Sequence, residues 1–458
     1  MNIALEKIRS ATAGSDFEGK LYLVGGVVRD QIMGVPEQED VDLVLEGDAL
    51  KLAQFLHRKR ISEHPPVIYR RFGTAMLTIG GQHIEIVTAR SESYERSSRK
   101  PDVQPATLLE DALRRDFTIN ALLRNLHTGE VLDLTGKGIS DIERKVIRTP
   151  LDPTRTFDED PLRMLRAVRF AARFGFEIEP ETYRALSTCA DRLAIISKER
   201  IRDEFTKILV GPDPTLGLEM MLETGLLTQF APELAAMTGC EQNKYHIYNC
   251  WTHTMKTVQA LPTNADLTLC LAALFHDVGK PETKTFEENG DAHFYGHEHV
   301  GAAIAARVMR RLRFSNDQVE IVRGLIDLHL RPGAYHENWT DTAVRRLMRE
   351  AGPLLDDLLT LSKADSSASN PELIHPDYAA LETRIAAVKA ELCIEQIRSP
   401  LDGKEIMRLL GIKPGPKVKE IKEFLLDEIL EGRLKPDDID TAREIALRHF
   451  GGNTEPSS

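Results

Sequence analysis

Cysteine is scarce in this chain and is arranged neither for zinc binding nor for a disulfide framework. The 458 residues contain five cysteines, an odd number, and no two of them form a Cys-x-x-Cys pair. Thiolate zinc sites use such close pairs, and disulfide-rich folds use even numbers of cysteines. We therefore expect the cysteines to be thiols of the hydrophobic core.

Long apolar runs and net positive charge are also missing. No segment approaches the run of about 20 apolar residues that spans a bilayer, and residues 1–13 have the pattern of an amphipathic helix rather than a signal peptide. We therefore expect a cytoplasmic protein with no membrane partner. The formal net charge of −12 argues against a surface coated with nucleic-acid-binding groups, so any contact with RNA must be local.

One local concentration of positive charge does exist. Eight basic residues lie between positions 144 and 173, whereas the acidic excess lies elsewhere. Because Lys and Arg near phosphates supply the affinity for RNA, this segment is the candidate RNA-contacting region. The eight are Arg144, Lys145, Arg148, Arg155, Arg163, Arg166, Arg169 and Arg173.

The length predicts three or four domains at about 100–200 residues each. Short β-rich runs with glycine-containing turns occupy residues 21–134, and the pattern turns helical after Pro150 and Pro153. We predict an α+β protein with a mixed α/β head followed by an all-helical remainder. The predicted strands are 21–24, 41–45, 74–79 and 83–88, with a helix over 48–58, and the predicted domains are 1–140 (head), 141–235 (neck), 236–370 (metal domain) and 371–458 (tail).

A strand that runs into two glycines and a helix forms the first candidate site. Residues 21–30 end in Gly25-Gly26-Val27-Val28-Arg29-Asp30. Glycines at such a turn let backbone N–H groups approach a triphosphate closely, beside the positive end of a helix. Taken alone, a turn of this kind is more often plain backbone geometry than a ligand site.

Two aspartates follow the glycine turn. Asp40 and Asp42 are two apart in a predicted strand, so both carboxylates face the same side. Carboxylates this close repel one another unless a cation lies between them, and Mg²⁺ bridging to nucleotide phosphates suits hard oxygen ligands. Glu85, on the strand over 83–87, is the candidate third ligand. The alternative is a solvated strand edge with two surface aspartates.

Five motifs, in this order, resemble those of the class II tRNA nucleotidyltransferase and bacterial poly(A) polymerase family. Any one of them could arise by chance, but five in sequence over residues 21 to about 210 are highly specific. They are Gly25-Gly26-Val27-Val28-Arg29-Asp30, Asp40-Val41-Asp42, Arg114-Arg115-Asp116-Phe117-Thr118-Ile119-Asn120-Ala121, Glu159-Asp160-Pro161-Leu162-Arg163 and Arg200-Ile201-Arg202-Asp203-Glu204-Phe205.

The resemblance implies a polymerase-β-like head in which Asp40 and Asp42 are catalytic and hold Mg²⁺, and its strand position makes Glu85 the predicted third catalytic carboxylate. It also implies that Arg115 and Asp116 read the ribose, for which the alternative is a salt bridge at a helix start. Phosphoryl transfer needs little beyond positioning and charge neutralisation, which agrees with these roles. The implied nucleotide-binding residues are Gly25, Gly26, Arg29, Arg115, Asp116, Asn120, Asp160, Arg163, Arg166 and Arg169.

Asp160 and Arg163 are the candidate base-reading pair. Three apart on a predicted helix over 160–174, they would share a face and present an acceptor beside a donor. Cytosine and adenine show an exocyclic amine beside a bare ring nitrogen, so this pair would accept them and reject uracil and guanine. The alternative is an ordinary ion pair. Arg166, Arg169 and Arg173 continue a basic stripe toward RNA phosphate or nucleotide, with a solvated face as the alternative, favoured for Arg173.

A second series, of histidines and aspartates, resembles the signature of HD phosphohydrolases. Imidazole and carboxylate ligands suit a divalent transition metal such as Mn²⁺ or Ni²⁺, and His297 is assigned rather than His299 on the family spacing. The resemblance implies hydrolysis of phosphomonoesters or cyclic phosphodiesters, with a structural or inactive domain as the alternative. The predicted ligands are His253, His276, Asp277, His297, His329 and Asp365.

Together these patterns predict an enzyme that adds CCA to the tRNA 3′ end from CTP and ATP. The turn at Pro414-Gly415-Pro416 would help the tail hold the tRNA elbow, or would simply cap a helix. Alternatives within the family add only A, only CC, or poly(A), and the segment 91–110 is the candidate for the switch from C to A. The alternative from another class is an HD phosphohydrolase with a nucleotide-sensing head, and the oligomeric state stays open.

Overall fold

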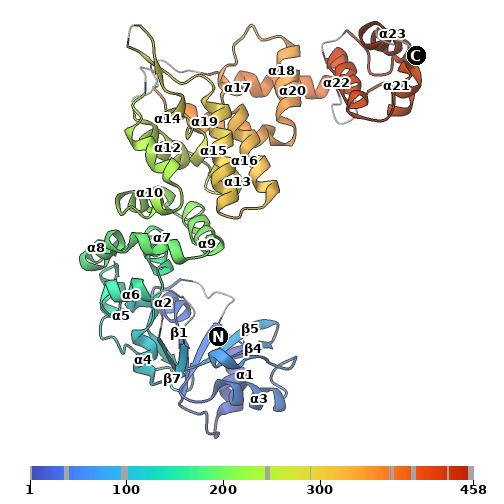
Figure 1. Cartoon of the computed structure of the whole chain (residues 1–458). Helices are drawn as coiled ribbons and strands as arrows, with labels where there is room; N and C mark the ends of the chain where they lie inside the picture. The colour runs from blue at the N-terminus through green and yellow to red at the C-terminus, as the bar shows by residue number, and fades with distance from the viewer. Residues whose placement is uncertain are drawn as a thin grey trace, which may run out of the picture. The chain divides into compact units, whose positions relative to one another are not determined.

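The computed structural model describes residues 3–35, 41–93, 102–242, 248–288, 290–370, 372, 376–392, 399–430 and 433–451. The chain divides into two compact units. The first comprises Met1–Ala236, Thr263–Leu267 and Arg307–Ser315, and the second comprises Met237–Pro262, Thr268–Ala306 and Asn316–Ser458. Figure 1 shows the sheet in the N-terminal part and helices in the rest of the chain.

The head is built on a seven-stranded mixed sheet in the order β3-β4-β5-β2-β1-β8-β9. Strands β2 and β5 are parallel, and the other neighbours are antiparallel. The strands predicted at 21–24, 41–45 and 74–79 are confirmed, and the one predicted at 83–88 begins one residue earlier. The strands are β1 (Leu21–Val24), β2 (Val41–Leu45), β3 (Val67–Tyr69), β4 (Thr74–Ile79), β5 (Gln82–Thr88), β8 (Leu123–Asn125) and β9 (Val131–Leu132).

Helix α3 (Ala49–Arg58) covers part of this sheet, packing on β4 and β5. It begins where the Asp48 carboxylate accepts hydrogen bonds from the backbone N–H groups of Leu50 and Lys51. Its apolar face buries Leu52 and Leu56 among others. The other elements of the head are α1 (Ile3–Thr12), α2 (Gly26–Ile32), α4 (Leu108–Leu113) and the ribbon of β6 (Arg90–Ser93) and β7 (Asp102–Pro105).

Helix α7 (Leu162–Phe174) is the central element of the rest of the first unit and packs on α6, α9 and α10. This part is not wholly helical, because β10 (Val146–Ile147) and β11 (Glu177–Ile178) form a short parallel pair. The expectation of an all-helical neck is corrected in that detail. The helices are α5 (Gly138–Glu143), α6 (Pro153–Glu159), α8 (Pro180–Thr188), α9 (Lys198–Leu209), α10 (Pro214–Glu223) and α11 (Pro232–Ala235).

Helix α19 (Leu355–Ser367) is the core helix of the second unit and contacts α12, α16 and α17. A short hairpin of β12 (Thr285–Phe286) and β13 (Ala292–His293) interrupts the helices. The remaining helices are α12 (Cys250–Gln259), α13 (Leu267–Phe275), α14 (Lys280–Thr283), α15 (His297–Arg311), α16 (Asn316–Leu328), α17 (Leu330–Gly333), α18 (Asp341–Ala351) and α20 (Tyr378–Leu392).

The C-terminal segment forms three helices around a core of its own. They are α21 (Gly403–Leu410), α22 (Pro416–Leu430) and α23 (Ile439–Phe450), and they bury Ile406, Ile421 and Ala442 together. Pro416 opens α22, so the Pro-Gly-Pro turn does precede a helix. Within the described ranges, no helix is long and apolar enough to cross a membrane. The cysteines at 189, 240, 250 and 270 are buried and free, as predicted, and Cys393 lies outside the described residues.

Candidate functional site

Two predicted catalytic carboxylates lie side by side in the sheet of the head. Asp42 on β2 is paired in register with Glu85 on the parallel strand β5. Burial raises the pKa of Glu85, and the negative charge of Asp42 raises it further, with Arg90 opposing both. Such mutual repulsion, on oxygen ligands at the surface of a rigid sheet, suits a divalent cation such as Mg²⁺. Asp40 lies outside the described residues, so its place beside Asp42 stays a prediction.

The glycine turn lies at the same end of the sheet as Asp42. Leu23, near the end of β1, pairs with Leu43 on β2, and Gly25 directly follows β1. Gly25 has a φ of 77°, which favours glycine. A Cβ atom there would lie 3.8 Å from Nη1 of Arg115, so the Arg115 guanidinium lies beside the turn. The structure therefore brings Gly25, Asp42 and Arg115 to one end of the sheet.

A chain of hydrogen bonds, buried except at its Arg166 end, joins four of the predicted nucleotide-binding residues. Arg29 Nη1 donates to Asn120 Oδ1 at 2.6 Å, and Asn120 Nδ2 donates to Asp116 Oδ1 at 3.0 Å. Arg166 donates through Nε and Nη2 to Asp116 Oδ2, at 2.8 and 2.6 Å. Because both polar atoms of the Asn120 amide are engaged inside the protein, Asn120 can act on a ligand chiefly by holding Arg29 and Asp116 in place.

Asp116 should make the stability of the first unit pH-dependent. Burial by itself raises the pKa of this carboxyl, but the charge of Arg166 and hydrogen bonds from Asn120 and Arg166 lower it to about 2. Since this pKa lies below the ordinary value of 3.8, we expect the contribution to be complete above about pH 4 and lost as the pH falls toward 2. The contribution of ionised Asp116 to the free energy of unfolding is roughly 2 kcal/mol. It can be measured by denaturant titrations, at a series of pH values, that follow the unfolding of the first unit.

Asp116→Asn is the control for this pH dependence. The amide carries no titratable proton, so the variant should be less stable at pH 5 and should lose less further stability between pH 4 and pH 2. If the variant and the wild type show the same pH dependence in this window, another carboxyl is responsible.

The expected common helix face of Asp160 and Arg163 is wrong. Helix α7 begins at Leu162, and Asp160 lies in the extended segment that ends α6. The Asp160 carboxylate accepts hydrogen bonds from Leu162 N and from Arg200 Nη2, each at 3.2 Å. The buried Arg163 guanidinium donates to the carbonyl oxygens of Arg114, at 2.7 Å, and Thr156, at 3.4 Å. The two side chains are thus each held separately.

Asp111 holds both arginines of the third motif. Its carboxylate is buried and pairs with Arg114 Nη2 at 2.7 Å and with Arg115 Nη2 at 2.9 Å. The alternative interpretation of this motif was a salt bridge at the start of a helix. It is wrong in its position, because Arg114 and Arg115 follow the end of α4. Nε of Arg115 is buried and has no hydrogen-bond partner within the residues that the structure describes.

The basic stripe on α7 has a carboxylate partner on α9. Arg169 Nε donates to Oε2 of the buried Glu204 at 2.7 Å. Around the same helix face, Arg166 and Arg169 lie over the ring of Phe170, and Arg173 lies over that of Phe174. The fifth sequence motif contains Arg200 and Glu204, but no role was predicted for either residue. Asp111 was not predicted as a site residue.

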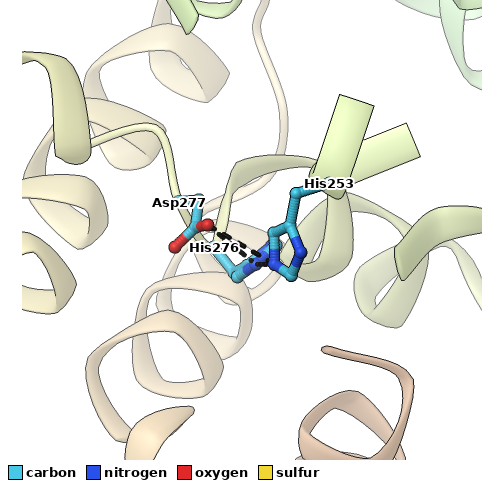
Figure 2. A group of neighbouring side chains, drawn as sticks. All are labelled: His253, His276 and Asp277. Atoms are coloured by element: carbon cyan, nitrogen blue, oxygen red, sulfur yellow. Dashed lines mark hydrogen bonds and ion pairs between the residues drawn. The ribbon is translucent and has the colours of Figure 1, made fainter. Parts of the chain in front are cut away.

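The six predicted HD ligands meet inside the second unit. They come from α12, the end of α13, the start of α15, the α16–α17 junction and α19. Figure 2 shows His253, His276 and Asp277 turned toward one another. The distances are 2.9 Å from His253 Nε2 to Asp365 Oδ1, 3.6 Å from His253 Nε2 to Asp277 Oδ2, 3.4 Å from His276 Nε2 to Asp277 Oδ2 and 3.4 Å from His297 Nε2 to Asp277 Oδ1.

The four imidazoles have a common orientation. Each turns Nδ1 toward a backbone carbonyl and Nε2 inward; the carbonyls belong to Ala368, Ala273, Phe294 and Ile326, at 3.3, 2.8, 2.8 and 2.6 Å. Such outer contacts fix the ring tautomer that leaves Nε2 able to bind a metal. Among the described residues, the buried Nε2 atoms of His297 and His329 have no hydrogen-bond partner.

This donor set fits a divalent transition metal. Imidazole nitrogen and carboxylate oxygen atoms converge in two overlapping groups, one of His253, His276 and Asp277 and one of Asp277, His297 and His329. Burial lowers the pKa of His329 to about 3, whereas Asp277 and Asp365 outweigh the effect of burial on His276 and raise its pKa to about 10. Metal binding requires the neutral form of both imidazoles. His299, by contrast, has an exposed side chain and pairs with Asp327, away from the cluster.

Lys280 is an additional buried residue at this site. Its Nζ donates to Asp277 Oδ2 and to Gln242 Oε1, each at 2.6 Å. The lysine therefore fixes one carboxylate oxygen of Asp277 and ties it to the segment before α12. Its place four residues after His276 in the HD signature is the sequence signal that could have assigned it.

Three family models match successive parts of the chain. Residues 21–148 match the poly(A) polymerase head domain. Residues 175–238 match the model described as "Probable RNA and SrmB- binding site of polymerase A". Residues 244–369 match the HD domain.

Relatives of known activity match most of the chain. A CC-adding tRNA nucleotidyltransferase of Thermus thermophilus is 33% identical over 446 residues, which cover 95% of this chain and 95% of that protein. An A-adding tRNA nucleotidyltransferase of Deinococcus radiodurans is 34% identical over 340 residues, covering 70% of this chain and 75% of that protein.

Solved structures share the fold. The CCA-adding enzyme of Bacillus stearothermophilus, in complex with CTP, is 22% identical with a TM-score of 0.68 over 98% of both chains. The CCA-adding enzyme of Thermotoga maritima, complexed with tRNA, is 22% identical with a TM-score of 0.58 over 98% of this chain and 96% of that one.

Proposed function

This chain belongs to the tRNA nucleotidyltransferase and poly(A) polymerase family, and we propose that it adds the full CCA sequence to the tRNA 3′ end from CTP and ATP. It is an enzyme that transfers nucleotides to the 3′ end of RNA. The observation that best supports nucleotide transfer, the part common to full and partial CCA addition, is the meeting of Asp42 and Glu85 with the glycine turn at Gly25 and with Arg115. This arrangement supplies positioning and charge, the two needs of phosphoryl transfer.

We assign the chemistry to this end of the sheet. The hydroxyl oxygen of the RNA 3′ end forms a bond to the α-phosphorus, the bond to the β-phosphate oxygen breaks, and pyrophosphate leaves while the hydroxyl proton passes to solvent. Asp42, with Asp40 and Glu85, would hold Mg²⁺, which supplies charge neutralisation for the hydroxyl and the triphosphate. The backbone at Gly25 and Gly26 receives the triphosphate, Arg115 lies against it, and Asp116, fixed by Arg166 and Asn120, binds the ribose.

Base selection is proposed for Asp160 and Arg163 despite their separate settings. A carboxylate has about four acceptor positions and a guanidinium five donors, and two on each are engaged inside the protein. Asp160 therefore retains capacity for the exocyclic amine of C or A, and Arg163 retains donors for the bare ring nitrogen. Arg200, bonded to Asp160, would hold that carboxylate in place.

The test uses tRNA transcripts that end before the first C, after one C, after CC and after CCA, each with CTP or ATP alone. We expect C on the first two, A on the CC-ended transcript, and nothing on the complete one. The Asp42→Asn variant, purified identically, reports any contaminating activity. Growth by one A on the CC-ended transcript, with CTP ignored throughout, would make this an A-adding enzyme. Growth by C alone would make it a CC-adding one, and a long A tail would make it a poly(A) polymerase.

A second activity is proposed for the second unit. The inward Nε2 atoms and the two carboxylates suit a divalent transition metal such as Mn²⁺ or Ni²⁺. We propose that this site hydrolyses phosphomonoesters or cyclic phosphodiesters. Each of the four proposed domains would then have its own role. Residues 1–140 would carry out nucleotide transfer, 141–235 would bind nucleotide and RNA, 236–370 would carry out hydrolysis, and 371–458 would bind the tRNA elbow.

A further inference from the structure

Two buried cysteines of the second unit lie against each other. Cys240 and Cys250 are both free thiols, with 3% and 0% of their surface exposed. The backbone N–H of Cys250 donates to the carbonyl oxygen of Cys240 at 2.9 Å, and the Cys250 thiol donates a hydrogen bond to the Cys240 sulfur. None of the roles proposed for the transfer site or the HD site involves either thiol.

The backbone hydrogen bond sets the two Cα atoms at a separation that a disulfide can span. With ordinary bond lengths, an N–H···O=C bond of this length keeps the two flanking Cα atoms within about 6.8 Å of each other. Disulfides join Cα atoms that are about 4.4–6.8 Å apart. The hydrogen bond between the thiols shows that the two side chains also point toward each other. A covalent bond between the sulfur atoms therefore needs only a small local movement.

The surroundings make Cys240 the more reactive of the two thiols. The hydrogen bond from Cys250 lowers the pKa of Cys240, burial opposes this effect, and the positive charges of Lys284 and Lys280 lower the pKa further. The same hydrogen bond, together with burial, raises the pKa of Cys250. The thiolate is the form that attacks oxidants. Because the residues on either side of Cys240 in the chain are exposed, a molecule as small as hydrogen peroxide can reach its sulfur after a small local opening.

The pair of thiols is connected to the HD metal ligands on both sides. Cys250 is the first residue of α12, the helix that carries His253. Gln242, in the segment that carries the other cysteine, accepts a hydrogen bond from Lys280 Nζ, which also donates to Asp277. A covalent bond holds two sulfur atoms closer together than a hydrogen bond does. Oxidation would therefore draw the segment before α12 toward that helix and weaken its contact with Lys280.

We propose that Cys240 and Cys250 form a reversible disulfide, with hydrogen peroxide as the oxidant, and that this disulfide weakens metal binding by the HD cluster. The Cys240 sulfur attacks one peroxide oxygen, the O–O bond breaks, and water leaves with the thiol proton, which gives a sulfenic acid. The Cys250 sulfur then attacks the Cys240 sulfur, the S–S bond forms, and a second water leaves with the Cys250 proton. The two cysteines lose two electrons, which the peroxide gains, and a dithiol reductant reverses the reaction. The action on metal binding rests on the metal site proposed for the second unit.

The experiment treats the reduced full-length protein with hydrogen peroxide, alkylates the remaining thiols in denaturant, and maps the peptides by mass spectrometry. We expect the peptides that contain Cys240 and Cys250 to be joined, and dithiothreitol to separate them. Because a disulfide restricts the unfolded chain, the melting temperature of the metal-free second unit should rise by roughly 5–10 °C on oxidation. In titrations with Mn²⁺, the oxidised form should bind the ion about tenfold more weakly than the reduced form.

Matched variants separate this pair from the other thiols. Cys240→Ala and Cys250→Ala should each lose the joined peptides and the rise in melting temperature. Cys270→Ala, which replaces another buried thiol of the second unit, should keep both. Recovery of Cys240 and Cys250 as alkylated thiols, or joined to other cysteines, would overturn the proposal, and so would equal affinity of the two forms for Mn²⁺. If the reduced wild type binds no Mn²⁺, the metal site proposed for the second unit fails instead, and the peptide map still decides whether the disulfide forms.

Discussion

Asp42→Asn is expected to lower nucleotide addition to tRNA by about 10³-fold or more while leaving the fold intact. The variant keeps the shape of the side chain but removes the charge that would hold Mg²⁺ beside the glycine turn. Asp42 is exposed, and its charge raises the pKa of the neighbouring Glu85. Removing that repulsion should leave the melting temperature of the head unchanged or slightly higher, so lost activity will not reflect lost structure.

The control for this experiment is Asp16→Asn, which removes an exposed carboxylate from the loop after α1. It should extend tRNA at the wild-type rate. Rates are measured from pyrophosphate release with tRNA and CTP, beside a thermal melt of each variant. An Asp42→Asn enzyme with undiminished release would show that the carboxylates of β2 are surface groups, and the role proposed for this end of the sheet would be lost.

Four of the seven strands of the sheet, β1, β2, β4 and β5, were predicted because each is a short run rich in apolar residues between turn residues, whereas β3, β8 and β9 were not predicted. The pattern of residues 41–45 is buried at four of its five positions, with Asp42 the exception. An isolated charged position in such a run is a local signal. By contrast, the partnership of Asp42 with Glu85 depends on which strands become neighbours, and no local pattern determines that order.

The start of α7 was misplaced although the sequence carried the correct signal. Proline disfavours the helical conformation at the residue before it, and Asp160, which precedes Pro161, is extended with φ −139° and ψ 97°. The spacing of Asp160 and Arg163 suggested one helical turn, but the proline places the first residue of the helix after it. The base-reading role of the pair stays a prediction, whereas the expectation that both side chains share one helix face was wrong.

The partners that fix the site residues were the least predictable part. Asp116 and Arg166 are 50 residues apart, and Arg169 and Glu204 are 35 apart, so tertiary packing alone brings them together. In the second unit the order of the ligand residues was enough to predict the cluster. The backbone carbonyls that orient the imidazoles could not be predicted, because they depend on where each helix ends.

Removing divalent metal with a chelator is expected to destabilise the second unit, and adding Mn²⁺ or Ni²⁺ back should stabilise it. An ion that binds only the folded cluster contributes about 4 kcal/mol at a thousandfold excess over its dissociation constant. For a unit of this size that corresponds to a rise in melting temperature of roughly 10 °C. Asp277→Asn should abolish the rise, because this carboxylate belongs to both groups of converging ligand atoms, and should lower phosphoester hydrolysis at least about 10²-fold.

The two neighbouring histidines of α15 provide the sharpest check on this site. His297 Nε2 is buried and points to Asp277, whereas His299 is exposed and bonded to Asp327. His297→Gln should therefore lose the metal-dependent rise in melting temperature, and His299→Gln should keep it. The reverse pattern would show that His299, and not His297, binds the metal. A rise in melting temperature retained by both variants would mean that the ion binds elsewhere. The Asp277→Asn variant should still add nucleotides to tRNA, because the residues proposed for nucleotide transfer lie in the first unit.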